Sequence, residues 1–372
     1  MASKLKKYFP MIRERQEILS QIHRNNILQA KFQSWTPEQQ EDFLNLCTGV
    51  RGLRLLYDGF FKELMNPEYV PERLNDFLSH MLCQKVKILR ILPGDSTRIA
   101  DESSLLIMDI VVELEDRSIA NVEMQKVGYL FPGQRSACYS ADLLLRQYKR
   151  IRGETDDNFS YQDIKSVYTI VLFEKSPKIF HAYPQDYYHF FEQKSDTGLK
   201  MELLQKYLFI PLDIFGKSQQ NKDISNKRDA WLTLFSNDDP DTIITLITAY
   251  PEFQQIYEEA YRICLNTERV MDMFSEELAI LDRNTVKYMM DEMQNEMDSM
   301  RNVIDGLQDA VRQQADELER KQATIQEMRE KNIEFLQNTI SILRGLDLPE
   351  SEIISRICDK YHLPEDQIQQ YL

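Results

Sequence analysis

Alternating apolar and polar positions mark two consecutive strands in the first half of the chain. The segment 105–126 alternates in two runs that are separated by a short polar break. A period of two is typical of strands, whose successive side chains point to opposite faces. Only one register brings the two apolar faces together, because a slip of one residue turns every side chain over. That register predicts a hairpin in which Asp109 lies near Glu123 and Gln125 on a mixed face.

Asp109 is the residue of this hairpin that most needs a partner. It stands in a run of apolar strand formers, where a carboxylate is costly unless it is paired, hydrogen-bonded or bound to a metal. One interpretation is a site at which Asp109 and Glu123 hold a divalent cation. The other is an edge hairpin whose polar face meets water. Glu113 and Glu115, further along the same face, are expected to be solvated charges.

The surrounding segment alternates between helix and strand patterns. A helix is expected to begin at Pro37 with Thr36 as its N-cap, because a capping residue followed by proline is typical of helix starts. The pattern also predicts helices at 72–82 and 134–150. An α/β core, with a mixed sheet flanked by helices, is expected at about 51–215. Its strands are expected at 86–92, 105–114, 119–126, 166–174, 187–194 and 206–214.

The expected helix at 134–150 has two different faces. The first face is polar and mostly basic, with members spaced by whole turns: Arg135, Tyr139, Asp142, Arg146 and Arg150. The opposite face is more apolar and is expected to pack on the sheet: Ala137, Ala141, Leu144, Leu145 and Tyr148. The basic face is either a surface that contacts phosphates or an ordinary solvated helix face.

The C-terminal part of the chain is helical and contains a heptad pattern. A helical region is expected at 216–284. Between Val286 and Phe335, twelve of the fifteen a and d positions are apolar, and no proline interrupts the run. This repeat predicts a long coiled coil at 285–344. The alternative is a long helix folded back on the helical region. A small helical tail is expected at 345–372.

The charge of the chain is acidic overall but basic in two places. The 372 residues carry a net charge of −15, which argues against indiscriminate binding to nucleic acid. Basic residues gather at 1–33, within a helical arm expected at 1–50, and again at 134–152. Local contact with DNA phosphates is therefore compatible with the composition.

Composition and motifs also limit the cellular compartment and the classes of reaction that the sequence supports. The five cysteines are scattered and form no CxxC pair, which indicates free thiols in a reducing cytoplasm and not a zinc site. No apolar run is long enough to span a bilayer, and the basic N-terminus lacks the apolar segment of a secretory signal. The motifs of nucleotide binding, hydride transfer, acyl transfer and zinc proteases are not in the sequence.

Four segments resemble the PD-(D/E)XK nuclease family transposases, the recombination-promoting nuclease group. They lie within about 60–214 and read FFKELMNPEYVPERLNDFL, LIMDIVVE followed by VEMQ, FPGQRSACYSADLLLRQY, and YQDIKSVYTIVLFE. The resemblance implies a restriction-endonuclease-like fold and a Mg²⁺ or Mn²⁺ ion bound by Asp109 and Glu123. The backbone carbonyl of Met124 is expected to complete the protein ligands, because Mg²⁺ prefers oxygen donors and keeps several waters.

The resemblance also implies roles for other residues. The last position of the motif is Lys in the wider family and Gln125 here, a neutral side chain that can orient water or phosphate. The family uses a helical acid before the first strand, which is expected to be Glu68 or Glu72. Arg135 and Tyr139 are expected to approach the active site, where an arginine can fork the phosphate oxygens.

These features predict a cytoplasmic, Mg²⁺-dependent DNA endonuclease that promotes recombination or transposition of mobile DNA. DNA is the expected partner, contacted by Arg146, Lys149 and Arg150, and the coiled coil predicts a homo-oligomer. The alternative is a catalytically weak or inactive nuclease fold that acts as a coiled-coil interaction or DNA-tethering module. Gln125 in place of Lys and the acidic net charge favour that alternative. One ion or two remain equally compatible with the sequence.

Overall fold

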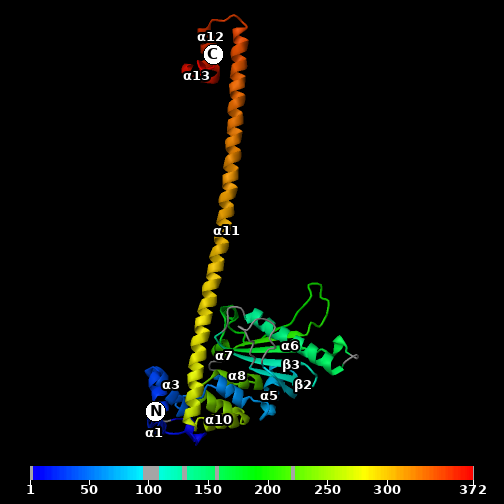
Figure 1. Cartoon of the computed structure of the whole chain (residues 1–372), viewed down its shortest axis with the longest axis vertical. Helices are drawn as coiled ribbons and strands as arrows, with labels where there is room; N and C mark the ends of the chain where they lie inside the picture. The colour runs from blue at the N-terminus through cyan, green and yellow to red at the C-terminus, as the bar shows by residue number, and fades with distance from the viewer. Residues whose placement is uncertain (1–2, 95–108, 128–131, 156–158, 219–222, 372) are drawn as a thin grey trace. The chain divides into compact units, whose positions relative to one another are not determined.

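The computed structural model describes residues 3–94, 109–127, 132–155, 159–218 and 223–371. The chain divides into two compact units, residues 1–292 and residues 293–372 (Figure 1). Part of the first expected hairpin strand, residues 105–108, lies outside the described residues.

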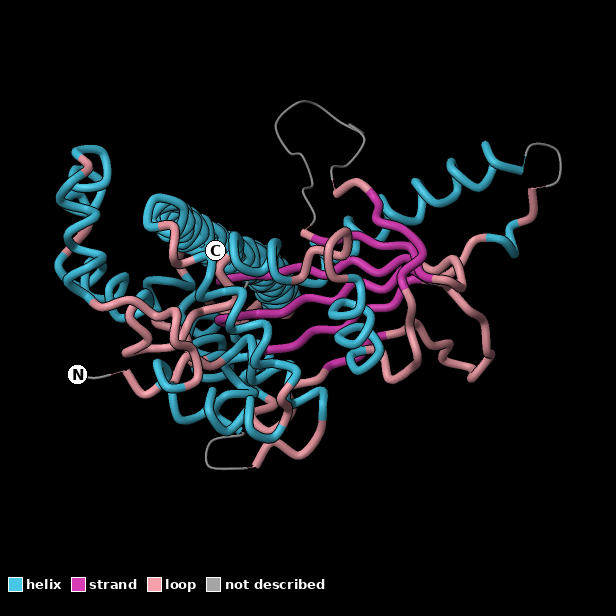
Figure 2. Tube along the Cα trace, turned by 90° about the horizontal axis from the view of Figure 1, so that it is seen from below, coloured by secondary structure: helices cyan, strands magenta, loops and turns pink. Residues whose placement is uncertain are grey.

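Within the described residues of the first unit, six strands form one mixed sheet in the order β1-β2-β3-β4-β6-β5. Figure 2 shows the strands of this sheet lying side by side. The antiparallel pairs are β1 with β2, β2 with β3, and β5 with β6, whereas β4 is parallel to both β3 and β6. A strand is present in each of the six expected places, and β5 is shorter than predicted. β6 ends at Pro211, so residues 212–214, expected in the strand, begin helix α7 Leu212–Ser218, and Asp109, expected within the second strand, directly precedes it. The bounds of the six strands are β1 Ile88–Leu92, β2 Ile110–Leu114, β3 Ile119–Val127, β4 Val167–Lys175, β5 His189–Phe191 and β6 Gln205–Pro211.

The register of the β2–β3 hairpin is the one that the alternation predicts. Ile110 pairs with Val122, and Val112 pairs with Ala120, so even positions face even positions. Odd positions therefore share the other face of the sheet. The apolar face is buried as expected, because a shifted register would have exposed it to water.

Helices surround the sheet in the first unit. Thr36 caps α3 with a reciprocal capping box to Gln39, and Pro37 is its first residue, which confirms the predicted helix start. The α-helices are α1 Arg15–Arg24, α2 Asn26–Ser34, α3 Pro37–Cys47, α4 Asp58–Leu64, α5 Pro71–Met81, α6 Pro132–Thr155, α7 Leu212–Ser218, α8 Lys227–Ser236, α9 Pro240–Ala249, α10 Glu252–Ile263 and the start of α11 Thr267–Arg344. The described residues also form the short 3-10 helices η1 Leu5–Lys7, η3 Tyr161–Asp163 and η4 Lys178–Ala182.

The main hydrophobic core lies on the apolar face of the hairpin. Val112 and Val122 from the sheet share this core with Phe9 and Phe43 from the N-terminal segment and Phe274 from α11. The segments 1–50 and 216–284, which the sequence sets apart from the sheet, thus contribute to the same core as the strands. The amphipathic helices of these two segments bury their apolar faces in this core.

Helix α6 covers the other face of the sheet, and its orientation corrects the prediction. Tyr139 and Leu143 are buried in a cluster with Val111 of β2, whereas Ala137 and Leu145 are exposed. The polar and mostly basic face of the helix packs on the sheet, and the more apolar face does not. The reason is that the sheet surface beneath it is itself mixed, so the polar face of the helix finds charged partners there.

The second unit consists of α11 from residue 293 onward, α12 Glu350–Tyr361 and α13 Glu365–Ile368. Its small core joins the end of α11 to the last two helices and contains Leu336, Ile340, Ile353, Ile357 and Ile368. Further back along α11, the apolar a and d residues are exposed, for example Met297 and Val311. No helix among the described residues combines the length and the hydropathy that a membrane crossing requires.

Candidate active site

Two carboxylates meet on the mixed face of the hairpin. Asp109 directly precedes β2, and the pairing of Ile110 with Val122 places it opposite Glu123 of β3. The backbone N–H of Met124 donates a hydrogen bond of 2.7 Å to Asp109 Oδ2. Glu123 is only 4% exposed. The structure therefore brings together the two acids that the alternation predicts as neighbours.

Burial disfavours the presence of two negative charges at this pair. Burial, assisted by the negative charge of Asp58, raises the pKa of Asp109 to about 6, against the opposing effect of the Met124 amide. Burial and the charge of Asp109 raise the pKa of Glu123 to about 8, although Arg135 acts in the opposite direction. Both shifts disfavour the double carboxylate. A divalent cation between the two groups would reverse this effect.

Asp58 and Lys62, from the first turns of α4, reach the pair although sequence reasoning did not single them out. Lys62 Nζ lies 2.9 Å from Asp58 Oδ2 and 3.9 Å from Asp109 Oδ1. The acid whose charge acts on Asp109 is Asp58, while Glu68 and Glu72, the two expected glutamates, are both exposed. The signal in the sequence is the i, i+4 spacing of the Asp58–Lys62 pair, which places both on one helix face.

Buried amide oxygens line the same face. Gln125 is 6% exposed, and its Oε1 has no hydrogen-bond partner among the described residues. Asn121 Nδ2 donates to Glu123 Oε1 at 3.1 Å, while Asn121 Oδ1 is left without a partner within the described part of the chain. Buried oxygens of this kind call for an ion or ordered water. They fit the hydrated shell of a bound Mg²⁺.

The protein ligands of such an ion would be few. No group of three or more His, Cys, Asp or Glu side chains among the described residues is arranged to hold a metal by itself. Asp109 and Glu123 would therefore share the ion with the Met124 carbonyl, waters and the substrate, which is how Mg²⁺ is commonly bound.

The next residue along β3, Lys126, belongs to a different environment. Its Nζ donates to the carbonyl of Leu56 at 2.5 Å and forms ion pairs with Glu174 at 3.2 Å and Glu277 at 2.9 Å. As the alternation predicts, Lys126 points to the opposite face from Gln125. It does not replace the lysine that the motif lacks.

Arg135 and Tyr139 approach the carboxylates from α6. The guanidinium of Arg135 lies 5.0 Å from the ring centroid of Tyr139, and its charge lowers the pKa of both Asp109 and Glu123. Tyr139 is buried beneath it. The first turns of α6 thus add a positive charge to the site.

A family model described as PD-(D/E)XK nuclease family transposase matches residues 55–290, more than half of the chain. The chain belongs to this family. The matched span includes α4, the whole sheet, α6 and the helical region that shares their core. Neither the curated proteins nor the solved structures contain a match.

The charge pattern of the sequence also predicts that basic residues on α6 contact DNA. Arg146 forms an ion pair of 2.5 Å with Asp142 and donates to the carbonyl of Pro93 at 2.9 Å. Arg150 lies 2.9 Å from Glu113. Lys149, in contrast, is exposed. Of the three residues expected to contact DNA, two are therefore occupied by partners within the chain.

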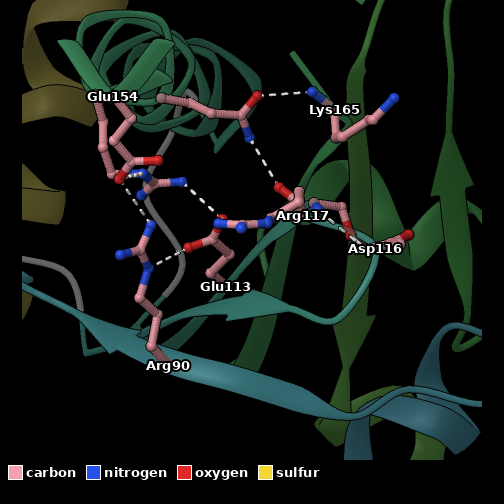
Figure 3. Close-up of polar contacts among 9 residues, drawn as sticks. Arg90, Glu113, Asp116, Arg117, Glu154 and Lys165 are labelled. Atoms are coloured by element: carbon pink, nitrogen blue, oxygen red, sulfur yellow. Dashed lines mark hydrogen bonds and ion pairs between the residues drawn. The ribbon is translucent and has the colours of Figure 1, made fainter. Parts of the chain in front are cut away.

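Glu113 corrects a further expectation. It is fully buried, not solvated, and accepts hydrogen bonds from Arg90 and Arg117 (Figure 3). Arg150 of α6 adds a third cation to the same carboxylate, and Glu154 pairs with Arg90 at 3.4 Å. This cluster joins β1, β2 and α6, and it explains why α6 turns its basic face inward.

The raised pKa values predict how the stability of the metal-free protein depends on pH. The folded state holds protons on Asp109 and Glu123 at pH values at which the unfolded chain has lost them, so stability falls as the pH rises from about 4 to 8. Asp109→Asn removes one of the two charges and should raise the Tm at pH 8 by roughly 3–6 °C. Thermal melts in EDTA at pH 5.5 and pH 8 measure both effects.

The control for this measurement is Glu115→Gln, which changes an exposed acid at the other end of β2 whose partner is Lys87. It should leave the pH dependence unchanged. Added Mg²⁺ should raise the Tm more at pH 8 than at pH 5.5, because metal binding requires the deprotonated pair. An Asp109→Asn variant with the same pH dependence as the wild type would contradict the proposed repulsion.

Proposed function

We propose that this protein is a metal-dependent DNA endonuclease that promotes recombination or transposition of mobile DNA. The observation that carries the proposal is the buried pair of Asp109 and Glu123 on one face of the hairpin, beside the unpartnered oxygens of Gln125 and Asn121. Membership of a nuclease-type family supports the same reaction class. The proposed ion is Mg²⁺, with Mn²⁺ as a substitute of similar ligand preference.

The residues of the site have different proposed roles. Asp109, Glu123 and the Met124 carbonyl hold the ion, and Gln125 orients a water or a phosphate oxygen through its amide. Arg135 neutralises the phosphate, with the Tyr139 ring fixing its position. A bound Mg²⁺ would supply a water of lowered pKa and stabilise charge on the leaving oxygen.

Lys62 is proposed to supply the positive charge that Gln125 lacks. Asp58 holds its ammonium group within 3.9 Å of Asp109 Oδ1, which is close enough to reach a phosphate bound at the carboxylates. A lysine in this place can stabilise negative charge in the transition state without standing on β3. This arrangement favours an active enzyme over an inactive nuclease fold.

A plasmid assay tests the function. Purified protein with supercoiled plasmid should produce open-circular or linear DNA with Mg²⁺ or Mn²⁺, and none in EDTA. Cleavage that persists in EDTA would contradict metal dependence. No cleavage with either ion, together with retained DNA binding, would favour the alternative of an interaction or tethering module, to which the neutral Gln125 points.

For DNA contact outside the reaction centre, Lys149 is the proposed residue on α6. It is exposed, whereas Arg146 and Arg150 hold the helix to the strands through the Pro93 carbonyl and Glu113. Arg146 and Arg150 are therefore proposed to support the DNA surface indirectly, by fixing the helix that presents it. The proposed setting is the cytoplasm, since the five cysteines are free.

We further propose that α11 forms a homo-oligomeric coiled coil. The exposed apolar stripe on this helix includes Met297, Ile304, Leu307 and Val311, each more than half exposed. A second copy of the same heptad pattern is the simplest partner that buries it. Two joined nuclease units could then cut both strands of a duplex.

Double substitution Ile304→Asp with Val311→Asp is expected to convert the oligomer into a monomer, because it places charges in the apolar seam. Residues 1–292 alone, which form a compact unit, are expected to be monomeric as well. Light scattering measures both. The matched control is Gln313→Asp, at a c position outside the seam, which should keep the oligomer. A monomeric wild type would contradict the coiled-coil proposal.

A further inference from the structure

An aromatic pocket lies between the start of α6, η4 and the β5–β6 edge of the sheet. Its volume is about 530 Å³, within the range of ~300–1,000 Å³ that is usual for small-molecule sites. Most of its lining is apolar or aromatic: Pro132, Gly133, Ala137, Ile179, Phe180, Tyr183, His189, Phe191, Tyr207 and Phe209, with Glu192 and Gln193 beside them.

The pocket is on the same face of the sheet as the carboxylate pair. Glu123 of β3 pairs with Val171 of β4, and Val171 pairs with Phe209 of β6. His189 of β5 continues the same row beside Phe209. Residues in one row point to one face, and neighbouring strands are ~4.8 Å apart. Phe209 thus lies two strands, or about 10 Å, from Glu123 on a shared surface.

The rings of the pocket are arranged as a partly open platform. Tyr183 and Phe191 are 56% and 49% exposed, so their faces are available to a ligand. Phe191 stands edge-on to the buried Phe209 at 5.4 Å between centroids, which fixes its orientation. The carboxylate of Glu192 at the edge pairs with Lys194, which reduces its repulsion of a phosphate. Aromatic surfaces of this kind stack nucleobases without reading their sequence.

We propose that this pocket binds unpaired nucleobases of the strand whose phosphate lies at Asp109 and Glu123. The inference rests on the proposed nuclease function and specifies its substrate. A stacked strand advances 3.4 Å per nucleotide, so bases about three nucleotides from the reaction centre reach the pocket. Bases inside an intact duplex are not accessible to it. The favoured substrate is therefore single-stranded DNA, or a duplex that is open beside the cleaved bond.

The test compares a labelled oligo(dT) strand with an abasic strand of equal length and charge, in EDTA so that no cleavage occurs. Fluorescence anisotropy should show that the wild type binds oligo(dT) more tightly than the abasic strand. Tyr183→Ala and Phe191→Ala should each weaken oligo(dT) binding by about tenfold, a typical effect for one stacked base. Binding of the abasic strand should change little.

Two further variants serve as controls. Phe191→Trp keeps a stacking surface and should retain affinity, while Tyr69→Ala removes a 78% exposed ring outside the pocket and should have no effect. Equal affinity of wild type and alanine variants for oligo(dT), or equal losses on both strands, would overturn the proposal. Base-dependent binding without any plasmid cleavage would contradict the nuclease function and support the pocket. Cleavage without base-dependent binding would support the nuclease function and contradict the proposed role of the pocket.

Discussion

Asp109→Ala and Glu123→Ala are each expected to reduce Mg²⁺-dependent plasmid cleavage by at least about 10²–10³-fold, the usual cost of removing one group that stabilises transition-state charge. Each substitution removes one of the two carboxylates proposed to hold the ion. The fold should persist, and in EDTA its stability should rise, because the like-charge repulsion between the two buried groups is relieved. Initial rates on supercoiled plasmid and thermal melts of the same preparations measure both parts.

The matched control is Glu115→Ala, which removes an exposed acid paired with Lys87 just beyond the same strand. It should cleave at the wild-type rate. Full activity of Asp109→Ala would place the reaction centre elsewhere on the molecule. Undiminished Mg²⁺ stabilisation of that variant would exclude Asp109 as a ligand even if cleavage were lost.

The same assay ranks the residues around the pair. Lys62→Met should lower the rate more than Gln125→Ala, because Lys62 is the cation that stands near Asp109 Oδ1. Asp58→Asn should reproduce part of the Lys62→Met loss, since Asp58 positions the ammonium group without touching the substrate. Lys62→Arg should restore activity in part. Equal rates for Lys62→Met and wild type would show that the positive charge comes from another group, for which Arg135 is the candidate.

The strands and their register could be predicted because the period of two is a local signal. A slip by one residue would have placed Ile110 and Val112 in the polar layer, so burial alone selects the pairing that puts Asp109 opposite Glu123. The start of α3 could also be predicted, since Thr36 and Pro37 act within one helical turn. Such features depend on residues that are neighbours in the sequence, so a short segment is enough to predict them.

The orientation of α6 could not be predicted in this way. Its apolarity alone favours packing through Ala137 and Leu145, yet these side chains are exposed. The deciding contacts are ion pairs between residues far apart in sequence, such as Arg150 with Glu113. Hydrophobic periodicity reports which side chains leave water, but it does not report which charges will meet inside the fold. The place of Lys62 beside the carboxylate pair could not be predicted for the same reason, because its partner Asp109 lies 47 positions away in the sequence.

Glu113→Ala is expected to destabilise the protein by about 3–5 kcal/mol, the usual cost of removing one partner from a buried ion pair. Glu113 is fully buried and is the carboxylate shared by Arg90, Arg117 and Arg150. Without it, Arg150 stays under α6 with its main counter-charge lost, since Glu154 is 4.0 Å away and partly solvated. Urea unfolding with two-state analysis measures the change.

Glu115→Ala again provides the comparison, because an exposed ion pair contributes at most about 1 kcal/mol. Arg150→Glu should also destabilise the fold, whereas Lys149→Glu should leave it intact and weaken DNA binding with a shallower salt dependence. This contrast would separate two proposed roles on one helix, in which Arg150 fixes α6 above the carboxylate pair and Lys149 contacts the phosphates. If Glu113→Ala were as stable as Glu115→Ala, the cluster would add nothing to the fold. Arg150 would then be available to DNA, as the charge pattern of the helix alone suggests.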